Sequence, residues 1–202
     1  MRLHTAEVPM LKKIAIGFVA VVVILLVVIA TRPARFHIER SASIAAPPEV
    51  VFALVNDFDQ WPQWSPWEKI DPTMQREVAG PDSGVGATYH WSGNDNVGEG
   101  RMTITESKPP ERIAIRLEFY KPWTATNQAL FSFKPAAGGT QVTWAMDGSN
   151  DFMGKAVSLV IDTDSLIGKS FEEGLTAMKT AAESQAKKSA ALVAAHGGAG
   201  RG

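Results

Sequence analysis

Residues 45–67, AAPPEVVFALVNDFDQWPQWSPW, combine a strand end, a prolyl turn, a short helix and an aromatic loop. Pro47 and Pro48 cannot continue a strand, but proline suits the first turn of a helix. Glu49 then falls in the first turn, where a negative charge meets the positive end of the helix dipole. The apolar residues of 50–55 recur at helical spacing, so the helix has one buried face.

Three tryptophans follow this helix at intervals of three residues. Trp61, Trp64 and Trp67 are separated by Pro62 and Pro66. The spacing places the rings on one side of a short helix or turn. We expect the segment to close one end of a domain. Its rings then either form an aromatic lip for a ligand or simply cover the core.

Alternating apolar and polar residues surround this segment and predict strands. The first strand is expected at 36–44, before the helix, where the alternation is broken only by Arg40. Further strands, separated by turn signals, are expected at 75–78, 87–92, 98–106, 112–120, 124–133 and 140–146. Their hairpin-length connections predict that neighbouring strands run antiparallel.

A long amphipathic segment closes the folded part of the chain, at 151–186. A cap-like sequence at 162–165 leaves open whether this is one kinked helix or two helices. The order of elements predicts an α+β fold in which one sheet face covers this helix. The Ala- and Gly-rich tail at 187–202 is expected to be disordered.

The amino terminus begins with a short tail, residues 1–13, followed by a segment at 14–31 whose residues 14–30 are all apolar. Seventeen uninterrupted apolar residues span roughly 25 Å as a helix, close to the thickness of a hydrocarbon core. We expect a single-pass membrane anchor, with a cleaved signal peptide as the alternative. The slight excess of positive charge before the run favours an extracytoplasmic domain.

The composition excludes several kinds of chemistry. The chain has 202 residues, a formal net charge of −1 and no cysteine. Disulfides, thiolate nucleophiles and cysteine zinc sites are therefore absent, and no basic face suggests a nucleic-acid partner. His37 and His90 lie on polar strand faces without a partner at catalytic spacing, and Asp162 and Asp164 fit helix caps. We therefore predict no metal site and no cofactor.

Three stretches carry a resemblance to a known superfamily. They are the strand end and helix at 44–67, the hairpin GVGATYHWSGNDNVGEGRMTITES at 84–107, and VTWAMDG at 142–148. Residues 36–186 resemble the SRPBCC superfamily of START-like, helix-grip proteins, especially those described as polyketide cyclase/dehydrase and lipid transport proteins. The resemblance implies a curved antiparallel sheet gripping the carboxy-terminal helix, with an apolar cavity between them.

The candidate cavity residues are large side chains on the predicted inner strand faces, together with two polar residues that interrupt such faces. They are Trp64, Trp67, Tyr89, Trp91, Met102, Ile104, Leu117, Asn127, Phe131, Trp144, Met146 and Arg40. A few polar groups in an apolar cavity orient a ligand. The alternative is that Arg40 extends to the sheet edge and Asn127 bonds to the backbone.

Three functions agree with this reading of the chain. The first is a membrane-tethered carrier for a hydrophobic, lipid-like or polyketide-like molecule, favoured because no nucleophile–base pair is recognisable. The second is a cyclase or dehydratase whose acid–base group would be Arg40, Asn127 or Tyr89. The third is a protein-interaction or stress-response domain. The superfamily spans all of these, so the fold does not choose between them.

Overall fold

The computed structural model describes residues 10–198, which form two compact units. The larger unit contains residues 35–149 and the residues from 163 onward. The smaller unit contains the described residues up to Ala34 together with residues 150–162.

A seven-stranded antiparallel sheet forms the frame of the larger unit, in the order β1-β7-β6-β5-β4-β3-β2. The hairpin turns predicted from glycine and proline separate β2 to β7, which explains why consecutive strands are neighbours. The prediction of an antiparallel sheet is confirmed. The strands are β1 (Arg35–Ile44), β2 (Gln75–Ala79), β3 (Thr88–Ser92), β4 (Glu99–Lys108), β5 (Arg112–Lys121), β6 (Ala125–Ala136) and β7 (Gly139–Ser149).

The first and last strands of the sheet pair with each other. β1 runs antiparallel to β7 from the pair Arg35–Ser149 to the pair Ile44–Thr140. The chain must therefore cross from β1 at one edge of the sheet to β2 at the other edge. The segment that makes this crossing is the helix and tryptophan stretch of 45–67, which consequently lies across the sheet.

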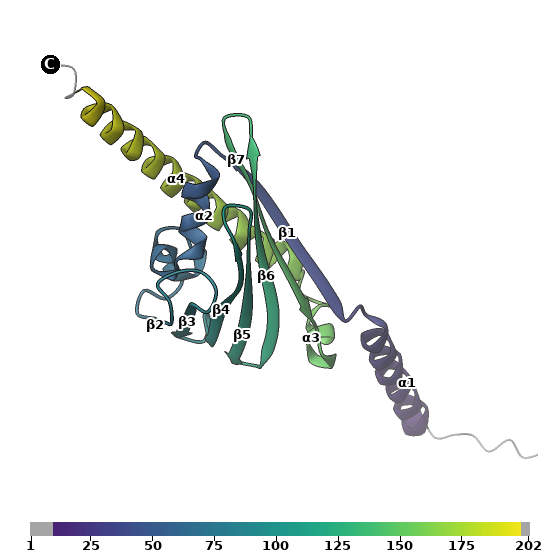
Figure 1. Ribbon diagram of the computed structural model, residues 1–202. Coiled ribbons are helices and arrows are strands. Elements are labelled where there is room, and N and C mark those ends of the chain that lie inside the picture. Colours follow the sequence, from purple (N-terminus) through teal and green to yellow (C-terminus); the bar gives the residue numbers. More distant parts are fainter. Residues whose placement is uncertain (1–9, 199–202) are drawn as a thin grey trace, which may run out of the picture. The chain divides into compact units, whose positions relative to one another are not determined.

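Helices cover one face of this sheet (Figure 1). The crossing segment folds into α2 (Pro48–Asn56) and two short 3₁₀ turns, η1 (Phe58–Gln63) and η2 (Pro66–Lys69). All three contact the long helix α4 (Thr163–Gly198), which also packs along β1. The sheet thus grips a carboxy-terminal helix, as the resemblance to helix-grip proteins implied.

The buried face of α4 follows helical spacing. Phe171, Leu175, Met178 and Ala182 are each at most 2% exposed and join the core. The helix continues to Gly198, so the predicted disorder from residue 187 is wrong for the described part of that tail. Alanine has the highest helix propensity, which explains the continuation. Residues 199–202 of that predicted tail lie outside the described residues.

The smaller unit joins an apolar helix to a short one. α1 (Met10–Thr31) is long and apolar enough to cross a membrane. It begins four residues before the predicted boundary at Ile14, and the predicted tail 1–13 lies otherwise outside the described residues. α3 (Phe152–Val157) is separate from α4, so the predicted carboxy-terminal segment consists of two helices.

Candidate ligand pocket

The first two tryptophans of the crossing segment fix the turn η1 to the end of α2. The indole N–H of Trp64 donates to the Leu54 carbonyl at 2.8 Å, and that of Trp61 donates to the Val55 carbonyl at 3.1 Å. Carbonyls in the last turn of a helix have no helical partner, so these bonds complete the carboxyl end of α2. Both tryptophans are buried, and their polar atoms are already satisfied.

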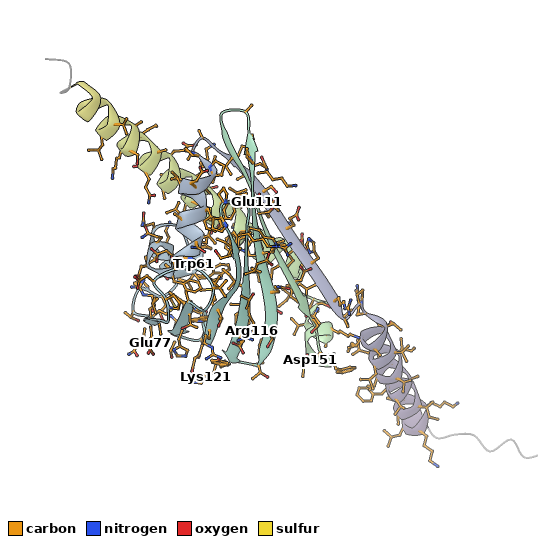
Figure 2. All side chains as sticks on the ribbon, viewed as in Figure 1. Trp61, Glu77, Glu111, Arg116, Lys121 and Asp151 are labelled. Atoms are coloured by element: carbon orange, nitrogen blue, oxygen red, sulfur yellow. The ribbon has the colours of Figure 1, made fainter. Side chains whose placement is uncertain are left out.

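The same rings pack against the sheet and α4. Trp64 meets Phe131 of β6 and Trp144 of β7 edge to face, with centroids 6.0 and 5.6 Å apart. Trp144 in turn stacks on Phe171 of α4 at 4.1 Å. Trp61, labelled in Figure 2, also meets Phe131 edge to face, with centroids 6.4 Å apart. Edge-to-face and offset stacked rings are the favoured arrangements of aromatic pairs, so this aromatic cluster is well packed.

An apolar pocket of about 220 Å³ lies beside the cluster. Its walls come from η1 and η2, the inner faces of strands β3 to β7, the loop between β3 and β4, and the first turns of α4. An engineered protein cavity of roughly 150 Å³ holds benzene. By that scale this pocket has room for a compact bicyclic ring system.

Seven of the predicted cavity residues line this pocket. They are Trp67, Tyr89, Trp91, Met102, Leu117, Trp144 and Met146. Trp64, Ile104 and Phe131 do not; each is at most 1% exposed and lies within the packed core. The third tryptophan differs from the first two, because Trp67 is only partly buried and contacts Trp144 and Phe171 at the pocket wall.

Arg40 and Asn127, the two polar candidates, are not among the residues that line the pocket. Arg40 reaches α4 instead, where its guanidinium donates to Asp164 and to Glu172 at 3.0 Å each. These carboxylates, Asp164 first, raise the pKa of Arg40. The Asn127 amide contacts the Met146 sulfur at 3.9 Å. Arg40 therefore ties β1 to the first turns of α4, and neither alternative role predicted for it is what the structure shows.

Trp61, one of the three tryptophans predicted to form either an aromatic lip or a core cover, also lines the pocket. Nine other lining residues were not candidates from the sequence. They are Ser65, Glu68, Met74, Asn96, Val97, Phe119, Ala129, Ile167 and Phe171. Phe119 and Ala129 continue the alternation of strands whose other members were candidates, so that pattern was a usable signal for them. Residues from η2 and the β3–β4 loop carry no periodic signal, because only tertiary packing brings them to the sheet.

One end of the pocket is polar. The Tyr89 hydroxyl donates to Glu68 Oε1 at 2.5 Å, and Arg76 Nη1 donates to Glu68 Oε2 at 2.5 Å. The Glu68 side chain is only 10% exposed, so its charge depends on these partners. Burial, and then the hydrogen bond to Glu68, raise the pKa of Tyr89 well above its ordinary value. Tyr89 is therefore a neutral phenol at physiological pH.

Two further lining residues, Ser65 and Trp144, carry polar groups. Ser65 is 4% exposed, and its hydroxyl does not cap η2. The indole N–H of Trp144 is buried and has no hydrogen-bond partner among the described residues. Buried polar groups are nearly always hydrogen-bonded, so the Trp144 N–H is an exception.

The described residues contain no cluster of three or more histidine, cysteine, aspartate or glutamate side chains that could hold a metal ion. Among the described residues that line the pocket, Glu68 supplies the one charged side chain, a carboxylate. A ring-sized apolar hollow with a few hydrogen-bonding groups is the usual form of a small-molecule site.

Comparisons with known proteins agree with this geometry. The family model described as polyketide cyclase / dehydrase and lipid transport matches residues 35–183. No curated protein matches this chain.

Solved structures share the fold at low sequence identity. The di-domain ARO/CYC StfQ from the steffimycin biosynthetic pathway matches with a TM-score of 0.58 at 11% identity, over 76% of this chain and 52% of that chain. The Aha1 dimer from Colwellia psychrerythraea matches with 0.54 at 17% identity, over 73% and 96%. A protein from Chromobacterium violaceum matches with 0.54 at 16% identity, over 73% and 96%. These likenesses establish the fold.

Proposed function

Because this chain belongs to the polyketide cyclase/dehydrase and lipid transport family, we propose that it is a membrane-tethered carrier for a hydrophobic small molecule. The observation that supports this proposal is the apolar pocket of about 220 Å³ between the sheet, the turns η1 and η2, and α4. An empty apolar hollow lowers stability, since its lining atoms lose contacts. A hollow kept within an otherwise tightly packed core is therefore best explained by an occupant.

The tether in this proposal is α1. Its 22 residues have the length and hydropathy to span a bilayer. Arg2, Lys12 and Lys13 precede the apolar run, and Arg32 and Arg35 follow it. This slight excess before the run supports the placement of the domain on the extracytoplasmic side. The chain lacks cysteine, so Glu77→Cys on the exposed strand β2 gives a single thiol for labelling from outside intact cells with a membrane-impermeant maleimide.

Blocking the pocket is the direct test of the carrier function. Ala129 lies on β6 at the pocket wall, whereas Ala136 lies exposed at the end of the same strand. Ala129→Phe should fill the pocket, and Ala136→Phe is the matched control. We expect the full chain in lipid nanodiscs to bind naphthalene by calorimetry, after subtraction of empty nanodiscs, with binding abolished by Ala129→Phe alone. Equal binding by both variants would refute the pocket as the carrier site.

A cyclase or dehydratase activity is the alternative, and one observation favours it. The Tyr89–Glu68 pair places a buried phenol and a carboxylate at the wall of the pocket. General acid–base catalysis needs such a group within hydrogen-bond reach of the substrate. Tyr89→Phe, compared with Tyr120→Phe outside the pocket, would then abolish turnover of a polyketide-like chain while binding of that chain persists. A carrier would show no turnover in any of these proteins.

A further inference from the structure

The polar end of the pocket carries information about the chemistry of its occupant. Its lining residues include one carboxylate, from Glu68, and no lysine, arginine or histidine. Arg76, the cation that balances Glu68, is not a lining residue and is bound to the second oxygen of that carboxylate. An anionic ligand group placed here would lose its water without gaining a cationic partner, which is costly.

The uncharged hydrogen-bonding groups at the wall are complementary to an oxygen that both donates and accepts. The Tyr89 hydroxyl uses its proton on Glu68, so its oxygen lone pairs remain to accept a bond. The hydroxyl of Ser65, another lining residue, can both donate and accept. Ser65 and Glu68 come from the start and the third residue of the same 3₁₀ turn, η2.

We propose that the pocket selects an uncharged apolar molecule carrying a hydroxyl or carbonyl oxygen, and rejects the corresponding carboxylate. This inference rests on the proposed carrier function and names its ligand class. Fatty acids and other carboxylates are then poor ligands, whereas alcohols, phenols and ketones of similar size are good ones. A carboxylate could be held only with its charged group left in solvent.

The test compares three molecules of one shape: naphthalene, 2-naphthol and 2-naphthoate. The full chain in nanodiscs is titrated with each at neutral pH, with empty nanodiscs as the blank. We expect 2-naphthol to bind at least about 5-fold more tightly than naphthalene, as one net hydrogen bond allows, and 2-naphthoate to bind most weakly. Naphthoate affinity equal to or above that of naphthol overturns the selectivity, while failure of all three to bind overturns the carrier function itself.

Two tyrosine variants test whether the Tyr89 hydroxyl causes the preference for naphthol over naphthalene. Tyr89→Phe removes the pocket hydroxyl and keeps the ring, and Tyr120→Phe makes the same change on an exposed residue of β5. We expect Tyr89→Phe to bring the affinity for naphthol close to that for naphthalene, and Tyr120→Phe to leave both unchanged. Naphthol selectivity that survives both Tyr89→Phe and Ser65→Ala contradicts the assignment of the polar end.

A separate observation concerns the smaller unit, where residues 151–162 expose large apolar side chains. Phe152, Met153, Val160 and Ile161 are 51%, 67%, 85% and 45% exposed. Four such residues within twelve form an apolar surface that water does not favour. The segment also contains the cation of Lys155 and the carboxylates of Asp151 and Asp162, one at each end.

This segment lies beside the carboxyl end of the apolar helix α1. The Asn150 N–H donates to the Ala34 carbonyl at 2.6 Å, and Lys155 Nζ donates to the Ala30 carbonyl at 3.4 Å. α1 contacts α3, and Ile29 near its end is buried. The apolar run of α1 ends at Thr31, so in a tethered chain this is the depth at which the helix leaves the hydrocarbon.

The geometry points to residues 151–162 as a second membrane contact, with Phe152, Met153, Val160 and Ile161 inserted into the lipid interface. Exposed apolar and aromatic side chains suit that layer. The bilayer is the expected partner because the segment is fixed to the helix that would span it. The inference depends on the proposed tether but makes a claim about a different part of the chain.

The absence of cysteine allows this contact to be measured by spin labelling of the full chain in nanodiscs. Labels at Met153→Cys and Val160→Cys should be more accessible to oxygen than to a water-soluble nickel complex. The control label at Glu77→Cys, on exposed β2, should show the reverse. A further label at Val23→Cys in α1 reports on the tether itself. If lipid shields label 23 while labels 153 and 160 are as accessible to the nickel complex as label 77, α1 spans the bilayer and the second membrane contact is wrong.

Discussion

Trp64 and Trp67 are three residues apart but have different environments. Trp64 is 1% exposed and its indole N–H is bonded to the Leu54 carbonyl. Trp67 is partly buried, lines the pocket and packs on Trp144 and Phe171. One ring therefore stabilises the core, while its neighbour forms the pocket wall.

Replacement of each tryptophan should separate these roles. Trp64→Ala is expected to cost about 3–5 kcal/mol of unfolding free energy, as for other buried aromatic residues, and it also leaves the Leu54 carbonyl without its side-chain partner. Trp67→Ala should cost less, because the ring is not fully enclosed, and should change naphthalene affinity several-fold. Thermal unfolding and calorimetry measure the two effects. A larger stability loss for Trp67→Ala would contradict this assignment.

His37 provides a pH-dependent contact between β1 and β7. Its Nδ1 lies 2.8 Å from Asp147 Oδ1, and this hydrogen bond raises the pKa of His37 above its ordinary 6.5. The stabilisation is therefore complete below pH 6.5 and is lost as the pH rises through the higher folded-state pKa. Asp147→Asn should lower the pKa of His37 in an NMR titration of its ring protons. An unchanged pKa in that variant would rule out the pair.

At the scale of elements, α4 lies close to the sheet because Gly174 has no side chain. A Cβ at this position would lie 2.8 Å from Cζ3 of Trp144 and 3.1 Å from Cδ of Pro66. Both neighbours belong to packed segments, and the Trp144 ring is held by stacking on Phe171. This approach brings α4, η2 and β7 together at the pocket wall.

The substitution Gly174→Ala should therefore be destabilising although alanine is the better helix former. Overpacking in a well-filled core costs about 1–3 kcal/mol, and the gain in helix propensity is about 1 kcal/mol, so we expect a net loss of up to about 2 kcal/mol. Ser184→Ala, on an exposed position of the same helix, is the control and should be neutral or slightly stabilising. Urea unfolding measures both. Stabilisation by Gly174→Ala would contradict the close approach.

The sequence predicted the helices and strands, but not how deeply each inner-face side chain is buried. Strand alternation correctly placed Ile104, Phe131 and Trp144 on the inner sheet face, because a side-chain period of two defines a face. It could not show that Ile104 and Phe131 lie in the packed core while Trp144 reaches the pocket. That distinction depends on where η1 and η2 cross the sheet, which is a tertiary property. Glu68 and Ser65 were missed for the same reason.

Arg40 shows how a polar residue on an inner face can be misread. Its position in β1 suggested either a ligand-orienting group or a side chain that extends to the sheet edge. In the structure, Asp164 and Glu172 of α4 bind its guanidinium instead. A single sequence does not show which carboxylates a helix will bring opposite a strand, so this ion pair could not be predicted.

At the scale of the whole molecule, the larger unit is a sheet that grips the helix α4, and the aromatic turns η1 and η2 pack against both. The large rings of residues 58–67 and of β6 and β7 fill one part of the interior, and the pocket remains beside them. The central prediction is that this pocket holds an uncharged apolar molecule in the living cell. The fold allows carriers and enzymes alike, so the occupant decides the function.

The most direct measurement is therefore the identification of what the protein carries. The full chain and its Ala129→Phe and Ala136→Phe variants would be purified from membranes into nanodiscs, extracted with organic solvent and compared by mass spectrometry. We predict one apolar, uncharged oxygen-containing species in near-stoichiometric amount with the unmodified chain and with Ala136→Phe, and its loss from Ala129→Phe. The same species profile in all three samples, equal to that of empty nanodiscs, would contradict the account.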